Sequence, residues 1–228
     1  MISEKFLQYC HKHPSLLRWR PNFKVYLGGG MAVKLYLMSL NKPVPREVGK
    51  TRDFDFTFAV DHPLSEDEVS KYSLEMYNIM YNFIKGFTRP DALKIKSYER
   101  KSLIPSTGKR TYHVIEFGKD FVDCTLAYVP DARRVLLKQY GLPISSHLYR
   151  DVLAVLTGSF VYTKIKPRNP IFGERKEKGL RNLARVKAIR RLRSATSDRT
   201  LKFISAIKHE NLSASERHAR AIIKHLTP

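Results

Sequence analysis

Apolar positions recur at helical spacing in three segments of the N-terminal half. Residues 2–13 and 31–40 each place apolar side chains along one side of a helix, which predicts a helix in both segments. Ser65 and Glu68 form the Ser-x-x-Glu pattern of a capping box, so a third helix is predicted from there to about Phe87. Its predicted buried stripe consists of Tyr77, Met80, Tyr81 and Ile84.

Between these helices the pattern is typical of strands. Residues 24–27 form a short apolar run that ends at three glycines, and acidic and apolar residues alternate at the start of residues 53–60. Further strands are predicted at about 93–99, 111–117 and 121–129. The last two are joined by a short turn at 118–120 and are expected to form a hairpin. This order predicts an α+β (mixed α/β) fold, in which helices flank a mixed sheet.

The remaining segments have a different character. Residues 41–51 contain two prolines, two lysines and an arginine, and they are predicted to form a basic loop. After Pro130 the pattern becomes helical. Helices are predicted at 131–140, 146–160, 174–193 and 199–209, and a last one follows Ser213. The expected organisation is a mixed domain of residues 1–130 followed by a basic helical domain of residues 131–228, with the boundary near 130–145.

The charge of the chain points to a polyanionic partner. The 228 residues include 42 Lys and Arg but only 21 Asp and Glu, which gives a formal net charge of +21. Such an excess favours binding to RNA, DNA or a nucleoside triphosphate. Residues 164–193 alone contain twelve Lys and Arg against two acidic residues. The candidate nucleic-acid-binding residues in this segment are Lys176, Lys178, Arg181, Arg185, Arg190 and Arg191. A solvated charged face and a nuclear-targeting patch are the alternatives.

Other features exclude several classes of protein. The two cysteines, Cys10 and Cys124, form no CxxC pair, which argues against a disulfide framework or a cysteine-rich zinc site. No apolar stretch approaches the roughly 20 residues that span a bilayer. The charged N-terminus does not resemble a signal peptide. We therefore expect an intracellular protein of the cytoplasm or nucleus, with no membrane partner.

Acidic residues within apolar strands are the candidate metal ligands. Asp53 and Asp55 lie two positions apart in a predicted strand, so their carboxylates project from the same face. Carboxylate oxygens are the ligands that Mg²⁺ prefers, and two-metal sites catalyse in-line phosphoryl transfer. Such a site needs a third carboxylate from a neighbouring strand. Asp123 is the first candidate, because it lies in a mainly apolar strand, and Glu116 on the partner strand is the reserve candidate.

The glycine run is the candidate phosphate-binding element. Gly28, Gly29 and Gly30 lie where the strand at 24–27 passes into the helix at 31–40. Glycines allow the backbone to approach a phosphate closely, and the N-terminus of a helix offers N–H donors. A simple tight turn is the alternative interpretation.

Together these motifs resemble the nucleotidyltransferase superfamily related to DNA polymerase beta. That family combines a hydrophobic residue, a glycine pair and a helix with an acidic–hydrophobic–acidic strand and a later third acidic residue. Leu27-Gly28-Gly29 is similar to the first element, Asp53-Phe54-Asp55 to the second and Asp123 to the third. The likeness covers about residues 24–129. The glycine pair, followed later by Thr51-Arg52-Asp53, is most similar to tRNA-type, poly(A)-type or toxin-like members.

The resemblance implies a two-metal reaction. It would transfer a nucleoside monophosphate from a triphosphate, for which ATP is the first guess, to a hydroxyl group, with Mg²⁺ or Mn²⁺ as the cofactor. Gly28, Gly29, Gly30, Thr51 and Arg52 would contact the triphosphate. The three aspartates, Asp53, Asp55 and Asp123, would hold the metal ions.

We expect the acceptor to be a 3′ hydroxyl of nucleic acid, with RNA favoured over DNA. Two alternatives remain: a non-catalytic nucleic-acid-binding protein on the same scaffold, and a toxin-like enzyme that modifies tRNA or protein. A protein partner or a second copy could complete the acceptor site.

Overall fold

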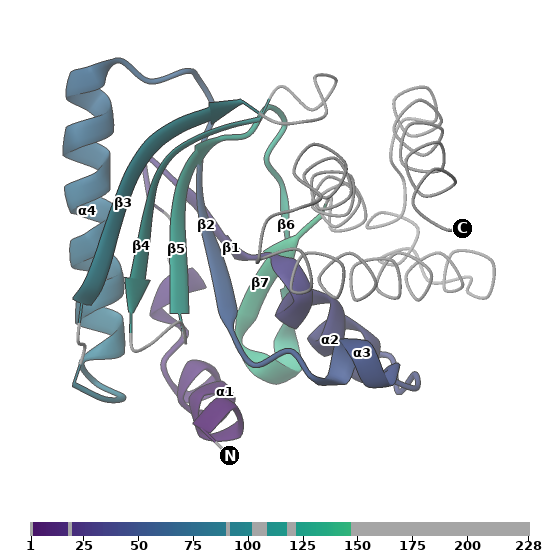
Figure 1. The fold of residues 1–228 in the computed structure, drawn as a ribbon. Coiled ribbons are helices and arrows are strands. Elements are labelled where there is room, and N and C mark those ends of the chain that lie inside the picture. The colour runs from purple at the N-terminus through teal and green to yellow at the C-terminus, as the bar shows by residue number, and fades with distance from the viewer. Residues whose placement is uncertain (1, 18–19, 90–91, 102–108, 118–121, 147–228) are drawn as a thin grey trace, which may run out of the picture.

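The computed structural model describes residues 2–17, 20–89, 92–101, 109–117 and 122–146 (Figure 1). The helices are α1 (Ile2–Lys12), η1 (Pro14–Leu17), α2 (Gly29–Ser39), α3 (Arg46–Gly49), α4 (Glu66–Ile84) and η3 (Lys138–Tyr140). The strands are β1 (Lys24–Leu27), β2 (Phe54–Val60), β3 (Ala92–Lys101), β4 (Arg110–Phe117), β5 (Val122–Tyr128), β6 (Arg134–Leu137) and β7 (Leu142–Ser145).

The seven strands form one sheet in the order β3-β4-β5-β2-β1-β7-β6. β2 pairs with β5 and β1 with β7 in parallel, whereas the other neighbouring pairs are antiparallel. α4 lies beside β3 and β4, while α2 and α3 lie toward β1 and β7 (Figure 1). The prediction of a mixed α+β fold is therefore confirmed, and so is the pairing of the two strands of the predicted hairpin, β4 and β5.

The prediction of a helix at residues 131–140 is wrong. Arg134–Leu137 forms β6, which pairs with β7, and only Lys138–Tyr140 makes a short 3-10 turn. Arg, Val, Leu and Lys are compatible with a helix, but pairing with a neighbouring strand overrides such weak propensities. The mixed sheet therefore continues to Ser145. The helices predicted at 174–193, 199–209 and after Ser213, and all but the first residue of 146–160, lie outside the described residues.

Two other predictions need adjustment. The segment 41–51 is not loop throughout, because it contains the short helix α3. α3 is attached to α2 by a hydrogen bond that the Lys34 Nζ donates to the Gly49 carbonyl at 3.3 Å. In addition, α2 begins at Gly29 rather than at Met31. The glycines therefore form the first turn of the helix as well as the end of the strand.

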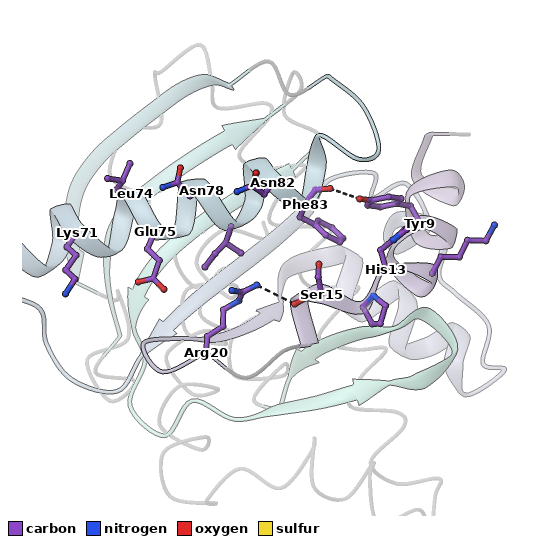
Figure 2. Close-up of a pocket in the computed structure, with 13 residues that line it drawn as sticks. Tyr9, His13, Ser15, Arg20, Lys71, Leu74, Glu75, Asn78, Asn82 and Phe83 are labelled. Carbon is purple, nitrogen blue, oxygen red and sulfur yellow. Dashed lines mark hydrogen bonds between the residues drawn. The ribbon is translucent and has the colours of Figure 1, made fainter.

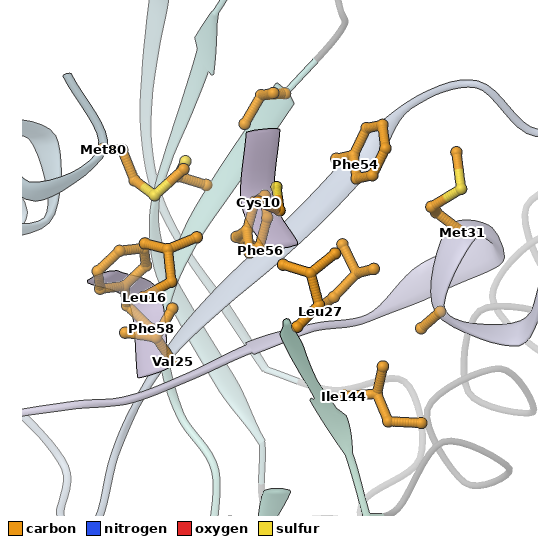
Figure 3. Close-up of a cluster of buried hydrophobic side chains, with 14 of the residues drawn as sticks. Cys10, Leu16, Val25, Leu27, Met31, Phe54, Phe56, Phe58, Met80 and Ile144 are labelled. Carbon is orange, nitrogen blue, oxygen red and sulfur yellow. The ribbon is translucent and has the colours of Figure 1, made fainter. Parts of the chain in front are cut away.

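The main core lies on one face of the sheet, which we call the helix-covered face. Phe54, Phe56 and Phe58 alternate along β2, and all three are fully buried on this face (Figure 3). The Phe6 ring of α1 packs edge-on against Phe54, with 4.7 Å between the ring centroids. Met76 and Met80 of α4 belong to the same buried cluster. The opposite face carries a second, smaller cluster of Tyr26, Ala59, Ala127, Val129 and Ala132.

The capping box of α4 is present as predicted. The Ser65 Oγ accepts a hydrogen bond from the Glu68 N–H at 3.4 Å, and the Glu68 Oε2 accepts one from the Ser65 N–H at 2.9 Å. The predicted buried stripe is half correct: Met80 and Ile84 are buried, whereas Tyr77 and Tyr81 are only partly buried. Among the described residues, no helix is long and apolar enough to cross a membrane.

Replacing Ser65 by Ala should lower the free energy of unfolding by about 0.5–2 kcal/mol, because the first turn of α4 loses its side-chain acceptor. Urea denaturation followed by circular dichroism measures this change. Ser70→Ala is the matched control, because Ser70 is exposed inside the same helix and Ala is the better helix former. The control should be neutral or slightly stabilising. Equal stabilities of the two variants would contradict the capping role.

Candidate active site

Three acidic residues lie side by side on three neighbouring strands. Asp55 of β2 is the in-register partner of Asp123 of β5, and Asp123 is in turn the partner of Glu116 of β4. Directly paired residues project from the same face of a sheet, with neighbouring strands about 4.8 Å apart. We call Glu116, Asp123 and Asp55 the carboxylate row. It lies on the face opposite Phe54 and Phe56, because alternate residues of β2 point to opposite faces.

The carboxylate row is partly removed from water. Glu116 is 8% exposed, and Asp55 and Asp123 are of intermediate exposure. One carboxylate oxygen of Glu116 and one of Asp123 are buried. Like charges on directly paired residues destabilise a sheet, and burial increases their repulsion. A cation bound at the row would offset this repulsion.

The glycine turn packs directly against the row. The Gly28 N–H donates a hydrogen bond to the Asp55 carbonyl at 2.7 Å, which extends the β1–β2 pairing by one residue. Gly29 has φ +60°, in the left-handed region, and a Cβ at this position would overlap the Asp55 Oδ2. Only glycine combines this conformation with such a close approach. The start of α2 and the carboxylate of Asp55 therefore share one small site.

The other predicted residues lie around this site with different exposures. Asp53 is exposed and directly precedes β2, which begins at Phe54 rather than at Asp53. Thr51 is buried and its N–H donates to the Val48 carbonyl at 3.2 Å, whereas Arg52 is exposed. Gly30 is buried in the first turn of α2. The candidate nucleic-acid-binding residues, Lys176, Lys178, Arg181, Arg185, Arg190 and Arg191, lie outside the described part of the chain.

Two hydroxyl groups next to the row were missed by the sequence analysis. Thr57 and Thr125 are in-register partners, and each lies two residues after an aspartate of the row. The Thr57 Oγ1 lies 3.9 Å from the position that a Cβ on Gly28 would occupy. The period-two repeat of polar residues, Asp55 with Thr57 and Asp123 with Thr125, was the available signal. The two hydroxyl groups therefore extend the polar surface of the sheet beside the carboxylates.

The pKa of the Cys124 thiol is affected by the charges of the carboxylate row. Cys124 is fully buried between Asp123 and Thr125 in β5, with its side chain in the main core. Burial raises the pKa of its thiol well above the usual range, and the charges of Asp123 and Asp55 raise this pKa further. Burial also raises the pKa of Cys10. Both thiols are buried in the main core and have raised pKa values, so neither is poised to act as a nucleophile.

The donors of the row suit a hard divalent cation. Carboxylates and hydroxyls offer only oxygen, which Mg²⁺ and Mn²⁺ prefer. Among the described residues, no three His, Cys, Asp or Glu side chains are arranged as a ready-made metal site. Mg²⁺ is usually bound by one or two carboxylates, with water and substrate phosphates as its other ligands. Asp55 and Asp123 fit that binding mode.

Comparisons with known proteins bear on the fold. No family model and no curated protein matches the chain. Among solved structures, the crystal structure of the Megavirus polyadenylate synthase is similar, with a TM-score of 0.53 and 12% sequence identity. The match covers 100% of this chain and 43% of that chain, so this chain spans less than half the length of that protein. At this identity the likeness concerns the fold alone.

Gly29→Ala should destabilise the protein by at least about 1–2 kcal/mol, because alanine is strained at positive φ and its Cβ would overlap the Asp55 carboxylate. Gly49→Ala is the matched control. A Cβ there would meet only the Val44 Cγ1 at 3.9 Å, an ordinary contact. Chemical denaturation compares the two variants, and equal stabilities would contradict the close packing of the glycine turn.

Asp123→Asn should stabilise the metal-free protein by up to about 1 kcal/mol, because it removes a like charge between Asp55 and Glu116. Mn²⁺ should raise the melting temperature of the wild type but have little effect on this variant. Asp67→Asn, an exposed position in the first turn of α4, makes the same chemical change away from the row. An Asp123→Asn variant that responds to Mn²⁺ as the wild type does would exclude Asp123 as a ligand.

Proposed function

We propose that this protein is a metal-dependent nucleotidyltransferase that transfers a nucleoside monophosphate from a triphosphate to a 3′ hydroxyl of RNA. The observation that carries the proposal is the contact between the glycine turn and the carboxylate row. The candidate phosphate-binding turn and a candidate metal-binding carboxylate are in close contact there, because a Cβ on Gly29 would overlap the Asp55 Oδ2. The likeness in fold to a protein described as a polyadenylate synthase supports the same class of reaction.

The start of α2 is the proposed phosphate site. Helix N-termini expose N–H groups that no helical carbonyl accepts, together with the positive end of the helix dipole. The N–H groups of Gly29 and Gly30 belong to this first turn, and the missing side chain at Gly29 lets the Asp55 carboxylate lie directly beside it. The exposed cations Lys50 and Arg52, close in sequence to β2, would add charge for the triphosphate.

The carboxylate row is the proposed catalytic centre. Asp55 and Asp123 would hold Mg²⁺ or Mn²⁺, with Asp53 at the entrance of β2 as a further ligand. The bound metal ions would stabilise the charge that develops on the attacking and leaving oxygens. Asp123 would accept the proton of the attacking hydroxyl. The 3′ oxygen would form a bond to the α-phosphorus. The bond between the α-phosphorus and the oxygen that bridges it to the β-phosphorus would break, and pyrophosphate would leave.

RNA is the proposed acceptor because of charge and fold. The formal net charge of +21 favours a polyanion, and the similar fold belongs to a protein described as a polyadenylate synthase. Adenosine triphosphate is accordingly the first donor to test. The basic segment 41–51, which contains α3 and in which Lys42 and Arg46 are exposed, is a proposed contact for the polyanion.

Transfer is tested with Mg²⁺ or Mn²⁺, each labelled triphosphate in turn, and RNA or DNA oligonucleotides. The wild type should extend RNA, and Asp55→Asn or Asp123→Asn should lower the rate at least about a hundredfold, because the metal contributes several kcal/mol. Asp67→Asn should keep wild-type activity. Glu116→Gln identifies the third carboxylate, because a decrease as large as that of Asp123→Asn would give Glu116 an equal role.

Three outcomes would overturn the proposal or its active site, and a fourth would narrow the acceptor. RNA binding without transfer under any condition would indicate a non-catalytic nucleic-acid-binding protein. Label incorporated into protein would indicate a toxin-like enzyme that modifies proteins, and label on tRNA only would restrict the acceptor to tRNA. Extension that survives in both aspartate variants would place the active site elsewhere.

A further inference from the structure

A hollow of about 1070 Å³ lies on the helix-covered face (Figure 2). The carboxylate row lies on the opposite face of the sheet. Its walls are the end of α1, the turn η1 and one side of α4. The Tyr9 hydroxyl donates a hydrogen bond to the Phe83 carbonyl at 2.8 Å, which attaches α1 to α4 at the hollow. Arg20 projects into it and donates to the Ser15 carbonyl at 3.4 Å.

A second hollow, of about 460 Å³, shares Arg20 with the first. It lies at the end of the sheet where β2 finishes at Val60 and β1 begins at Lys24. Its wall includes Ala59 and Ala132, which belong to the small apolar cluster on the face of the carboxylate row. The two hollows therefore adjoin at Arg20, one on the helix-covered face and the other at the end of the sheet, beside the face of the row.

Cationic side chains outnumber acidic ones in both hollows, which together we call the basic track. They contain six cations and two carboxylates. The cations are Lys12, Arg20, Lys24, Lys71, Arg133 and Arg134. The two carboxylates have partners: Glu75 accepts from the Asn22 amide at 2.9 Å, and Asp61 contacts His62 at 2.8 Å. The basic track is therefore suited to a polyanion.

The uncharged groups favour a nucleic acid over an acidic protein segment. Asn78 and Asn82 are exposed and lie one helical turn apart on α4, facing the same hollow. Their carboxamides both donate and accept, as base edges require. The first hollow alone is at the upper limit of pockets for single small molecules. A chain that turns around the end of the sheet must also be flexible, as a single strand is.

We propose that the basic track binds single-stranded RNA and leads it toward the carboxylate row. Ala59, on the wall of the second hollow, is four residues from Asp55 along β2. At about 3.3 Å per residue this corresponds to roughly 13 Å. The direction of the path rests on the proposed function, whereas binding of RNA to the basic track does not.

The test measures binding of a fluorescent, unstructured RNA oligonucleotide to the full chain by anisotropy, without metal or triphosphate. Lys12→Glu and Lys71→Glu reverse charge in the first hollow, and Arg133→Glu reverses it in the second. Each should weaken binding severalfold. The slope of log K against log salt should become shallower by about 0.7 for each phosphate that the variant no longer neutralises. Lys138→Glu is the matched control, because Lys138 is exposed and lines neither hollow.

Equal affinities for the three variants and Lys138→Glu would overturn the proposal, because only the net charge would then matter. Circular dichroism of each variant checks that it folds. As a measurement without substitutions, photocrosslinking of wild-type protein to RNA containing 4-thiouridine should label peptides from residues 9–24 and 71–83. Absence of both peptides would also overturn it. If the three variants bind RNA more weakly but the wild type transfers no nucleotide, the basic track would be supported and only the proposed function contradicted.

Discussion

The parallel pairing of β2 with β5 is the constraint on which the site depends. Seven residue pairs run from Phe54 with Val122 to Val60 with Tyr128. The alternate pairs that contain Phe54, Phe56 and Phe58 fill the main core, so the intervening pairs must face the other way. Asp55 and Asp123 are one such pair. A slip of one residue would place aspartates in the core and phenylalanines on the opposite face, which fixes the register strongly.

The same pairing creates a local cost. Asp55 and Asp123 are direct neighbours, Glu116 follows on the next strand, and Gly29 adopts a positive φ against Asp55. None of these features favours stability by itself, because like charges repel and glycine increases the entropy of the unfolded chain. The core beneath them holds the arrangement in place. Unfavourable contacts that a fold retains at one place are typical of functional sites.

Local signals predicted much of this structure. The capping box at Ser65 and the alternation along β2 were legible because both depend on residues close in sequence. So was the passage from β1 through the glycines into α2. Asp55 and Asp123 could be named as candidates for the same reason, since acidic residues stand out within apolar strands.

Pairing between distant segments could not be predicted. β6 and β7 form because β1 offers an edge for pairing, which the helical spacing of residues 131–140 does not reveal. The choice between Asp123 and Glu116 depended on hairpin register, and the register makes them neighbours on one row. Asp53 showed the same pattern as Asp55, yet the strand begins after it. The basic track combines residues from four separate segments of the chain, so no local sequence pattern predicts it.

The proposed phosphate and metal sites adjoin each other where the glycine turn packs against the carboxylate row. The most direct test is a crystal structure with Mn²⁺ and a non-hydrolysable triphosphate analogue, in which anomalous scattering locates the manganese. We expect manganese in contact with the carboxylates of Asp55 and Asp123, and triphosphate oxygens at the N–H groups that begin α2. Manganese bound away from the row, or a triphosphate bound elsewhere, would contradict it.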